Sequence, residues 1–170
     1  MEITKIEVHV VGPEDERYTW SEDIEEVYQS NTIIRIFTDE DIVGEAAVWN
    51  ATYFEYDKYT AESLRHLLPI LIGKDPLNRE EILYEIRPRV FPQPPGAQAL
   101  IDNALWDILG KKCKAPIYKI LGGRRNKIKS YASTAMYDTI DEYLKVVSEM
   151  IDEGFSAVKF HTYCIPKKDL

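Results

Sequence analysis

The C-terminal part of the chain has the pattern of a strand, a helix and a second strand joined by short turns. Residues 128–133 are rich in strand-forming side chains, a helix is expected from Asp138 or Thr139 to about Glu153, and residues 157–161 are predicted to form the next strand. A helical crossover makes the two strands parallel. Parallel strands are normally covered on both faces and flanked by neighbours, so this pair does not make a domain by itself.

Two ionisable side chains lie near the end of the second of these strands. Because side chains alternate along a strand, Lys159 and His161 are expected on one face, together with the small Ala157. A lysine and a histidine side by side can act as a proton-transfer pair. The simpler interpretation is an edge strand with its polar face in water, and the residue pattern by itself favours that interpretation.

Charge and cysteine content argue against several classes of protein. The 29 acidic residues outnumber the 21 lysines and arginines, for a formal net charge of −8, which argues against a nucleic-acid-binding or basic membrane-binding surface. Cys113 and Cys164 fit no zinc or redox spacing and are expected to be free thiols in a reducing compartment. No apolar run has membrane-spanning length and the N-terminus has no apolar leader. We expect a soluble, cytoplasmic protein.

The N-terminal part is predicted to form a three-stranded antiparallel meander. Residues 3–10 partly alternate between polar and apolar side chains, residues 32–37 are β-branched, and residues 42–49 return after a turn. Residues 12–30 are acidic and aromatic without a clear period, and we expect them to form a long loop.

Helical segments follow the meander. Helices are expected at residues 59–68 and from Asn78 to about Ile86, and the prolines between residues 87 and 96 are expected to interrupt the helical pattern. The strongest helix runs from Ala97 to Lys112, because its apolar side chains recur at helical spacing: Ala97, Leu100, Ile101, Ala104, Leu105, Ile108 and Leu109. Its small residues allow close approach to a neighbouring element.

The strongest helix also carries a specific motif. Residues 99–111 are ALIDNALWDILGK, and PIYKILGG follows at residues 116–123. This combination resembles the mandelate racemase/muconate lactonizing enzyme family of the enolase superfamily, and the order of elements fits over nearly the whole chain. The resemblance implies an α+β capping domain at residues 1–125, and the first strand, helix and second strand of a TIM-type (β/α) barrel at residues 126–170.

The resemblance also implies a chemistry. Members of the family remove the proton α to a carboxylate, with Mg²⁺ stabilising the resulting charge and a Lys or His acting as base. In many members the second barrel strand ends in Lys-x-Lys, whose first lysine contacts the carboxylate and lowers the pKa of the second. In this chain the corresponding pair is Lys159 and His161. The match departs at His161, which is expected to be either a base or a hydrogen-bond donor to the substrate. An imidazole is shorter than the lysine side chain, and imidazoles in general titrate nearer neutrality than ammonium groups.

Two loops of the capping domain set substrate specificity in this family. By position they correspond to the segment around residues 12–30 and the segment just after Trp49. The aromatic residues that are candidates for the walls of the pocket are therefore Tyr18, Trp20, Trp49 and Tyr53. For Trp49, packing in the core of the capping domain is an equal alternative. The implied substrate is a small carboxylate, such as an acid sugar.

A complete barrel takes roughly 250 residues, and only a small part of that length follows Ile128. In the family the metal ligands are acidic residues on the third, fourth and fifth barrel strands, which these residues do not include. We therefore expect an N-terminal portion of a racemase, epimerase or acid-sugar dehydratase that binds no magnesium and is inactive alone. The alternative is a non-catalytic, stand-alone capping module that associates with itself or completes a partner. Unpaired strands with apolar Val158 and Phe160 predict a homo-oligomer.

Overall fold

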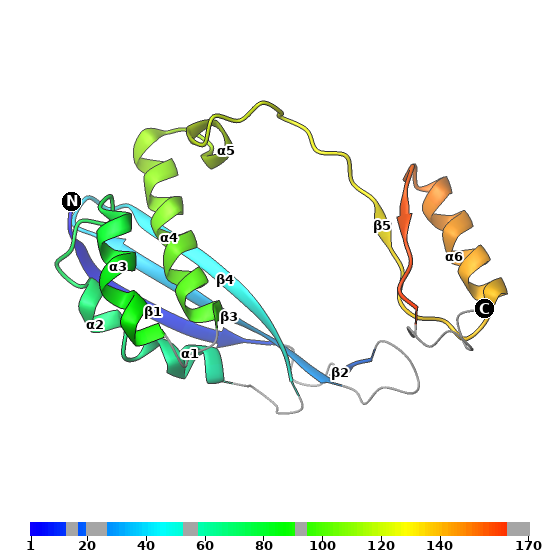
Figure 1. The fold of residues 1–170 in the computed structure, drawn as a ribbon, viewed down its shortest axis with the longest axis horizontal. Coiled ribbons are helices and arrows are strands. Elements are labelled where there is room, and N and C mark those ends of the chain that lie inside the picture. The colour runs from blue at the N-terminus through cyan, green and yellow to red at the C-terminus, as the bar shows by residue number, and fades with distance from the viewer. Residues whose placement is uncertain (13–16, 20–26, 53–57, 91–94, 163–170) are drawn as a thin grey trace. The chain divides into compact units, whose positions relative to one another are not determined.

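The computed structural model describes residues 1–12, 17–19, 27–52, 58–90 and 95–162. The chain divides into two compact units, which can be followed in Figure 1. The first comprises Met1–Arg17 and Val27–Arg124, and the second comprises Tyr18–Glu26 and Arg125–Leu170.

An antiparallel sheet forms one layer of the first unit. Strand β3 (Val27–Thr38) lies at its centre and pairs with β1 (Ile3–Val11) along one edge and with β4 (Val43–Thr52) along the other. A two-residue strand, β2 (Arg17–Tyr18), belongs to the same sheet. The predicted three-stranded antiparallel meander is thus confirmed.

Strand β3 begins within the range that was predicted to be a loop. Its first half buries the hydroxyl side chains Ser30 and Thr32, so its inner face is not apolar there. A search for alternating apolar residues therefore misses this part of the strand. The Thr32 hydroxyl accepts a hydrogen bond from the Asn50 amide on β4 at 3.2 Å, which satisfies this buried polar group.

Helices cover one face of this sheet (Figure 1). They are α1 (Tyr59–Leu64), α2 (Leu68–Leu71), α3 (Arg79–Val90) and α4 (Pro95–Cys113), and the short α5 (Ile117–Ile120) follows. Helix α4 contacts both β3 and β4. The predicted apolar stripe of α4 forms the centre of the core, since all its members are buried except Leu109, which is half-buried. They pack with Ile34 and Ile36 of β3.

The prediction that prolines interrupt the helical pattern between residues 87 and 96 is wrong for residues 87–90, which belong to α3, and for residues 95–96, which belong to α4. Helix α3 continues through Pro88 to Val90. Proline removes one main-chain donor from a helix, but here it lies in the last turn, where few further hydrogen bonds depend on it. The Arg89 guanidinium donates to the carbonyl oxygen of Glu85 at 3.0 Å, which supports this turn.

The second unit contains β5 (Ala132–Ser133), α6 (Ile140–Asp152) and β6 (Val158–Lys159). Strands β5 and β6 pair in parallel, with Ala132 opposite Val158 and Ser133 opposite Lys159, which confirms the predicted strand–helix–strand unit. The paired stretch is shorter than predicted because each strand has a single neighbour among the described residues, whereas parallel strands normally have two.

Helix α6 begins where the sequence predicted. The Thr139 hydroxyl accepts from the Glu142 main-chain N–H, and the Glu142 carboxylate accepts from the Thr139 main-chain N–H. This reciprocal pair is a capping box, which fixes the first turn of a helix.

Candidate functional site at the carboxyl end of β6

The two predicted proton-transfer residues lie at the carboxyl end of β6. Lys159 is the last residue of the strand and its side chain is exposed. His161 follows two residues later, beyond the paired stretch, and is half-buried. In barrels and open sheets of parallel strands, ligands bind at the carboxyl ends of the strands. The position of both residues is therefore that of a functional site in such folds.

The main chain of His161 is held by Thr134, the residue that follows β5. The His161 N–H donates to the Thr134 hydroxyl at 3.0 Å, and the Thr134 N–H donates to the Lys159 carbonyl oxygen at 2.9 Å. The Thr134 side chain thus extends the pairing of β5 and β6 by one further step. On the imidazole ring, Nδ1 lies 2.6 Å from the Thr134 carbonyl oxygen and 3.5 Å from the Ser133 hydroxyl.

Tyr143 on α6 also holds the main chain of His161. Its hydroxyl donates to the His161 carbonyl oxygen at 2.6 Å and accepts from the Tyr137 N–H at 3.1 Å. Its ring packs edge-on against Tyr137 and Phe160, with centroid distances of 5.1 and 5.8 Å. Helix α6 therefore supports the segment that carries His161.

Thr134 and Tyr143 did not emerge from the sequence analysis. Thr134 directly follows the predicted strand at residues 128–133, and the position after a parallel strand is one where functional residues gather, so this signal was present. Tyr143 carries no comparable signal, because its contact depends on where α6 packs against the strands.

The candidate pocket walls are only partly described. Trp49 is 51% exposed and its indole N–H donates to the Gln29 side-chain oxygen at 3.3 Å. Because the residue is not buried, the alternative that it packs in the core is wrong. Tyr18 lies in β2, where its side chain is not described, and Trp20 and Tyr53 lie outside the described residues. The role of all four in substrate binding stays a prediction.

The open face of the sheet carries charged side chains that neutralise one another. Glu7 on β1 contacts Lys5 at 2.5 Å and His9 at 3.3 Å on its own strand, and Arg35 on β3 at 3.4 Å. The hydrogen bonds from Lys5 and then His9 lower the pKa of the Glu7 carboxyl below its usual range. His9 belongs to this solvated network, as a surface histidine commonly does.

Two side chains of the motif at residues 99–111 anchor the start of α3. The Arg79 guanidinium pairs with the Asp102 carboxylate at 2.6 Å and lies 4.7 Å from the ring centroid of Trp106. An arginine held by a carboxylate and an aromatic face fixes the packing of two helices. These two motif residues therefore have a structural role.

Two further residues of the motif form hydrogen bonds with main-chain groups at the edge of the sheet. The Asp107 carboxylate accepts from the Glu45 main-chain N–H at 2.8 Å, and the Lys111 ammonium donates to the Val43 carbonyl oxygen at 2.7 Å. Asp107 and Lys111 also pair with each other at 2.7 Å. Among the described strands β4 pairs with β3 alone, so these side chains cover groups on an edge that would otherwise accept another strand.

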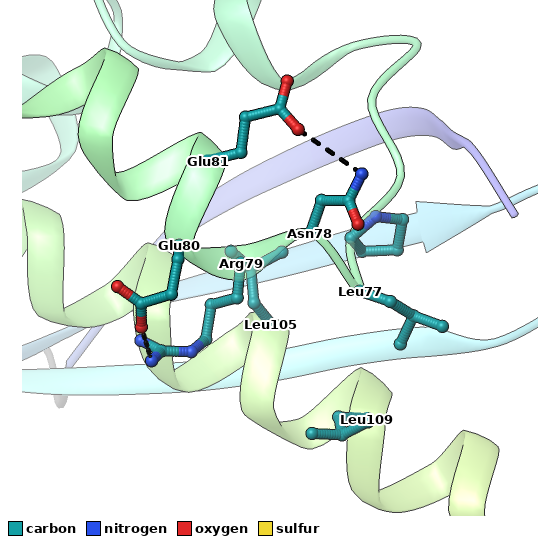
Figure 2. Close-up of a pocket in the computed structure, with 8 residues that line it drawn as sticks. Leu77, Asn78, Arg79, Glu80, Glu81, Leu105 and Leu109 are labelled. Carbon is teal, nitrogen blue, oxygen red and sulfur yellow. Dashed lines mark hydrogen bonds and ion pairs between the residues drawn. The ribbon is translucent and has the colours of Figure 1, made fainter.

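A cavity of about 380 Å³ lies at the start of α3 (Figure 2). Its apolar wall is formed by Leu105 and Leu109 of α4, and its polar groups contact one another. Figure 2 shows the ion pair between Arg79 and Glu80 and the hydrogen bond from Asn78 to Glu81 at 3.4 Å. Because these groups are already paired, we interpret the cavity as a gap between packed helices and assign it no ligand.

Two further classes of site were sought in the described part of the chain. No three His, Cys, Asp or Glu side chains gather there in a way that would hold a metal ion. Nor does any helix in these ranges combine the length and the apolar character that crossing a bilayer requires.

Comparison with known proteins gives consistent matches. Residues 6–122 match the family model described as "Mandelate racemase / muconate lactonizing enzyme, N-terminal domain". A cis-3-hydroxy-L-proline dehydratase of Roseibium aggregatum is 35% identical in an alignment of 163 residues that covers 92% of this chain and 42% of that protein.

Solved structures show the same similarity. A Pseudovibrio sp. structure, provisionally described as a mandelate racemase/muconate lactonizing enzyme, has a TM-score of 0.89 and 39% identity over 98% of this chain and 45% of its own. A dipeptide epimerase of Enterococcus faecalis V583, solved with Mg and the dipeptide L-Leu-L-Tyr, has a TM-score of 0.81 and 25% identity over 99% of this chain and 48% of its own. The chain spans less than half the length of each of these three proteins.

Proposed function

Because the chain belongs to the mandelate racemase/muconate lactonizing enzyme family, whose N-terminal domain it matches over residues 6–122, we propose that it is part of an enzyme that removes the proton α to the carboxylate of a small acid. In this proposal residues 1–125 are the capping domain and residues 126–170 begin the catalytic barrel. The relatives include a dehydratase and an epimerase, and both reactions are consistent with this first step. An acid sugar or an amino-acid derivative is the proposed class of substrate.

The observation that carries the proposal is the position of Lys159 and His161 at the carboxyl end of β6. We assign Lys159 to the substrate carboxylate, because an ammonium group neutralises its charge and so favours loss of the neighbouring proton. His161 is assigned as the base. The Cα–H bond of the substrate breaks, the proton goes to the imidazole, and the electron pair is delocalised into the carboxylate.

Magnesium is implied by the family, and the dipeptide epimerase holds it. When bound, the ion stabilises the negative charge that develops on the carboxylate. The described residues contain no cluster of ligands that would hold such an ion. They therefore do not fit the metal, and no residue of this chain is assigned to it.

Exchange of the α-hydrogen with solvent tests the proposal most directly. The complete enzyme of which this chain is proposed to be part, expressed from its own gene, is incubated in D₂O with Mg²⁺ and, in turn, with acid sugars, hydroxyprolines and dipeptides. We expect loss of the α-proton NMR signal for one of these classes, or the elimination product that follows proton removal. Absence of both with every carboxylate would contradict the proposal and favour the non-catalytic capping module.

A specific observation favours the alternative function, a non-catalytic capping module that associates with itself or completes a partner. Three apolar side chains on one side of α6 are strongly exposed, namely Ile140 at 69%, Leu144 at 62% and Ile151 at 59%, and Phe160 is 52% exposed. Their spacing places the three helical residues on one face, and a face of this kind favours association. We expect the 170-residue chain to form a homo-oligomer. A monomer mass that does not change with concentration in light scattering would contradict this.

A further inference from the structure

The contacts of His161 indicate which ring nitrogen carries the hydrogen. Nδ1 lies 2.6 Å from the main-chain carbonyl oxygen of Thr134, and a carbonyl oxygen can only accept a hydrogen bond. We infer that neutral His161 is held as the Nδ1–H tautomer with its lone pair on Nε2, and that Thr134 and Tyr143 are the positioning residues that hold it there. The catalytic meaning of this inference rests on the proposed function, whereas the tautomer itself does not.

Thr134 holds the histidine through three polar groups. Its N–H donates to Lys159, its hydroxyl accepts from the His161 N–H, and its carbonyl oxygen accepts from Nδ1. The residue is only 2% exposed. Turning the imidazole away would remove a donor from a carbonyl group on a buried residue, and such a loss costs free energy. The ring is therefore restrained together with the main chain.

Tyr143 restrains the other end of the same residue. Its hydroxyl holds the His161 carbonyl oxygen at 2.6 Å, and that hydroxyl is in turn held by the Tyr137 N–H. Both main-chain polar groups of His161 are thus engaged, one by Thr134 and one by Tyr143. A side chain whose backbone is fixed on both sides loses less freedom when it binds a substrate.

The tautomer decides which ring atom can take a proton. With hydrogen on Nδ1, the acceptor is Nε2, the outer nitrogen of the ring. A histidine in a catalytic triad is oriented in the same way, by a partner on Nδ1 that leaves Nε2 to act as base. Here the partner is a neutral carbonyl oxygen. It fixes the orientation without placing a second full negative charge beside the substrate carboxylate.

Nitrogen NMR measures the tautomer directly. The full 170-residue chain, labelled with ¹⁵N-histidine, is studied by long-range ¹H–¹⁵N correlation at a pH well above the titration of imidazole. For His161 we expect a protonated-type shift for Nδ1 and an unprotonated-type shift for Nε2. His66, which is exposed, gives the reference for an imidazole in water, which favours hydrogen on Nε2. A His161 spectrum like that of His66 would overturn the inference.

Paired variants test the positioning residues. Thr134→Val removes the hydroxyl and keeps the shape, whereas Thr134→Ser keeps the hydroxyl. Tyr143→Phe removes the hydroxyl that holds His161. Tyr137→Phe also removes a hydroxyl, but it keeps the ring and the main-chain N–H that contact Tyr143. We expect the fraction of Nδ1–H tautomer to fall in Thr134→Val and Tyr143→Phe and to be unchanged in the other two.

An unchanged tautomer in all four folded variants would refute the positioning roles. The wild-type spectrum decides the tautomer even where a variant does not fold. An Nδ1–H tautomer in a protein without α-proton exchange would refute the proposed function while leaving the tautomer assignment intact, so the two failures can be distinguished.

Discussion

Replacement of His161 by alanine is expected to slow exchange of the substrate α-hydrogen by roughly 10²–10⁴-fold, which is the usual contribution of a positioned base. The physical reason is that the variant lacks the imidazole to which the proposal assigns removal of the proton from the α-carbon. Binding of the carboxylate is expected to change less, because Lys159 is retained. The measurement is the initial rate of deuterium incorporation at saturating and at low substrate concentration, which separates kcat from KM.

A second variant distinguishes the two roles left open for His161. Glutamine carries an amide N–H near the position of Nε2, so it can donate a hydrogen bond to the substrate but cannot accept a proton from carbon. His161→Gln is therefore expected to be as slow as His161→Ala. A rate near that of the wild type would show that His161 is a hydrogen-bond donor and contradict its assignment as base. His66→Ala is the matched control and is expected to leave the rate unchanged, because this exposed side chain lies just after α1.

Much of the fold followed from periodicity. The apolar residues of α4 recur at helical spacing, and the structure buries nearly all of them in the core. The meander was predictable because two of its strands flank a short turn. The start of α6 was predictable because Thr139 and Glu142 have the spacing of a capping box. In each case the residues that form the pattern lie near one another in the sequence.

The features that were missed depend on contacts between distant residues. The beginning of β3 is held by pairing with β1 and β4 on its two sides, and its buried hydroxyl groups give no apolar pattern. At the candidate site, strand alternation and a family resemblance pointed to Lys159 and His161. The contribution of Thr134 comes largely from its main-chain groups and from the register of β5 against β6. A side-chain pattern does not contain this information.

Replacement of Gly44 by alanine is expected to destabilise the protein by about 1–3 kcal/mol, the usual cost of overpacking a well-packed core. A Cβ atom on Gly44 would lie 2.2 Å from the main-chain oxygen of Ala104 and 2.6 Å from Cγ1 of Ile108. A change from glycine to alanine normally stabilises by about 0.4–1 kcal/mol, because it restricts the unfolded chain. Here the free-energy cost of the clash is larger than that gain. The main-chain oxygen of Ala104 belongs to a helix and cannot rotate away, so β4 has to move away from α4. The measurement is the urea midpoint of unfolding.

Two further variants show whether the backbone contact is responsible. Ala47 lies on the same strand and is exposed, so Ala47→Val adds bulk without a clash and is expected to change stability by less than about 0.5 kcal/mol. In a double variant, Ile108→Ala removes the side-chain part of the clash at Gly44→Ala but leaves the Ala104 oxygen in place. We therefore expect the two changes together to be less stable than Ile108→Ala alone. Equal stability of these two proteins would assign the clash to the Ile108 side chain and refute the backbone explanation, because close approach of β4 to the backbone of α4 would then not require glycine.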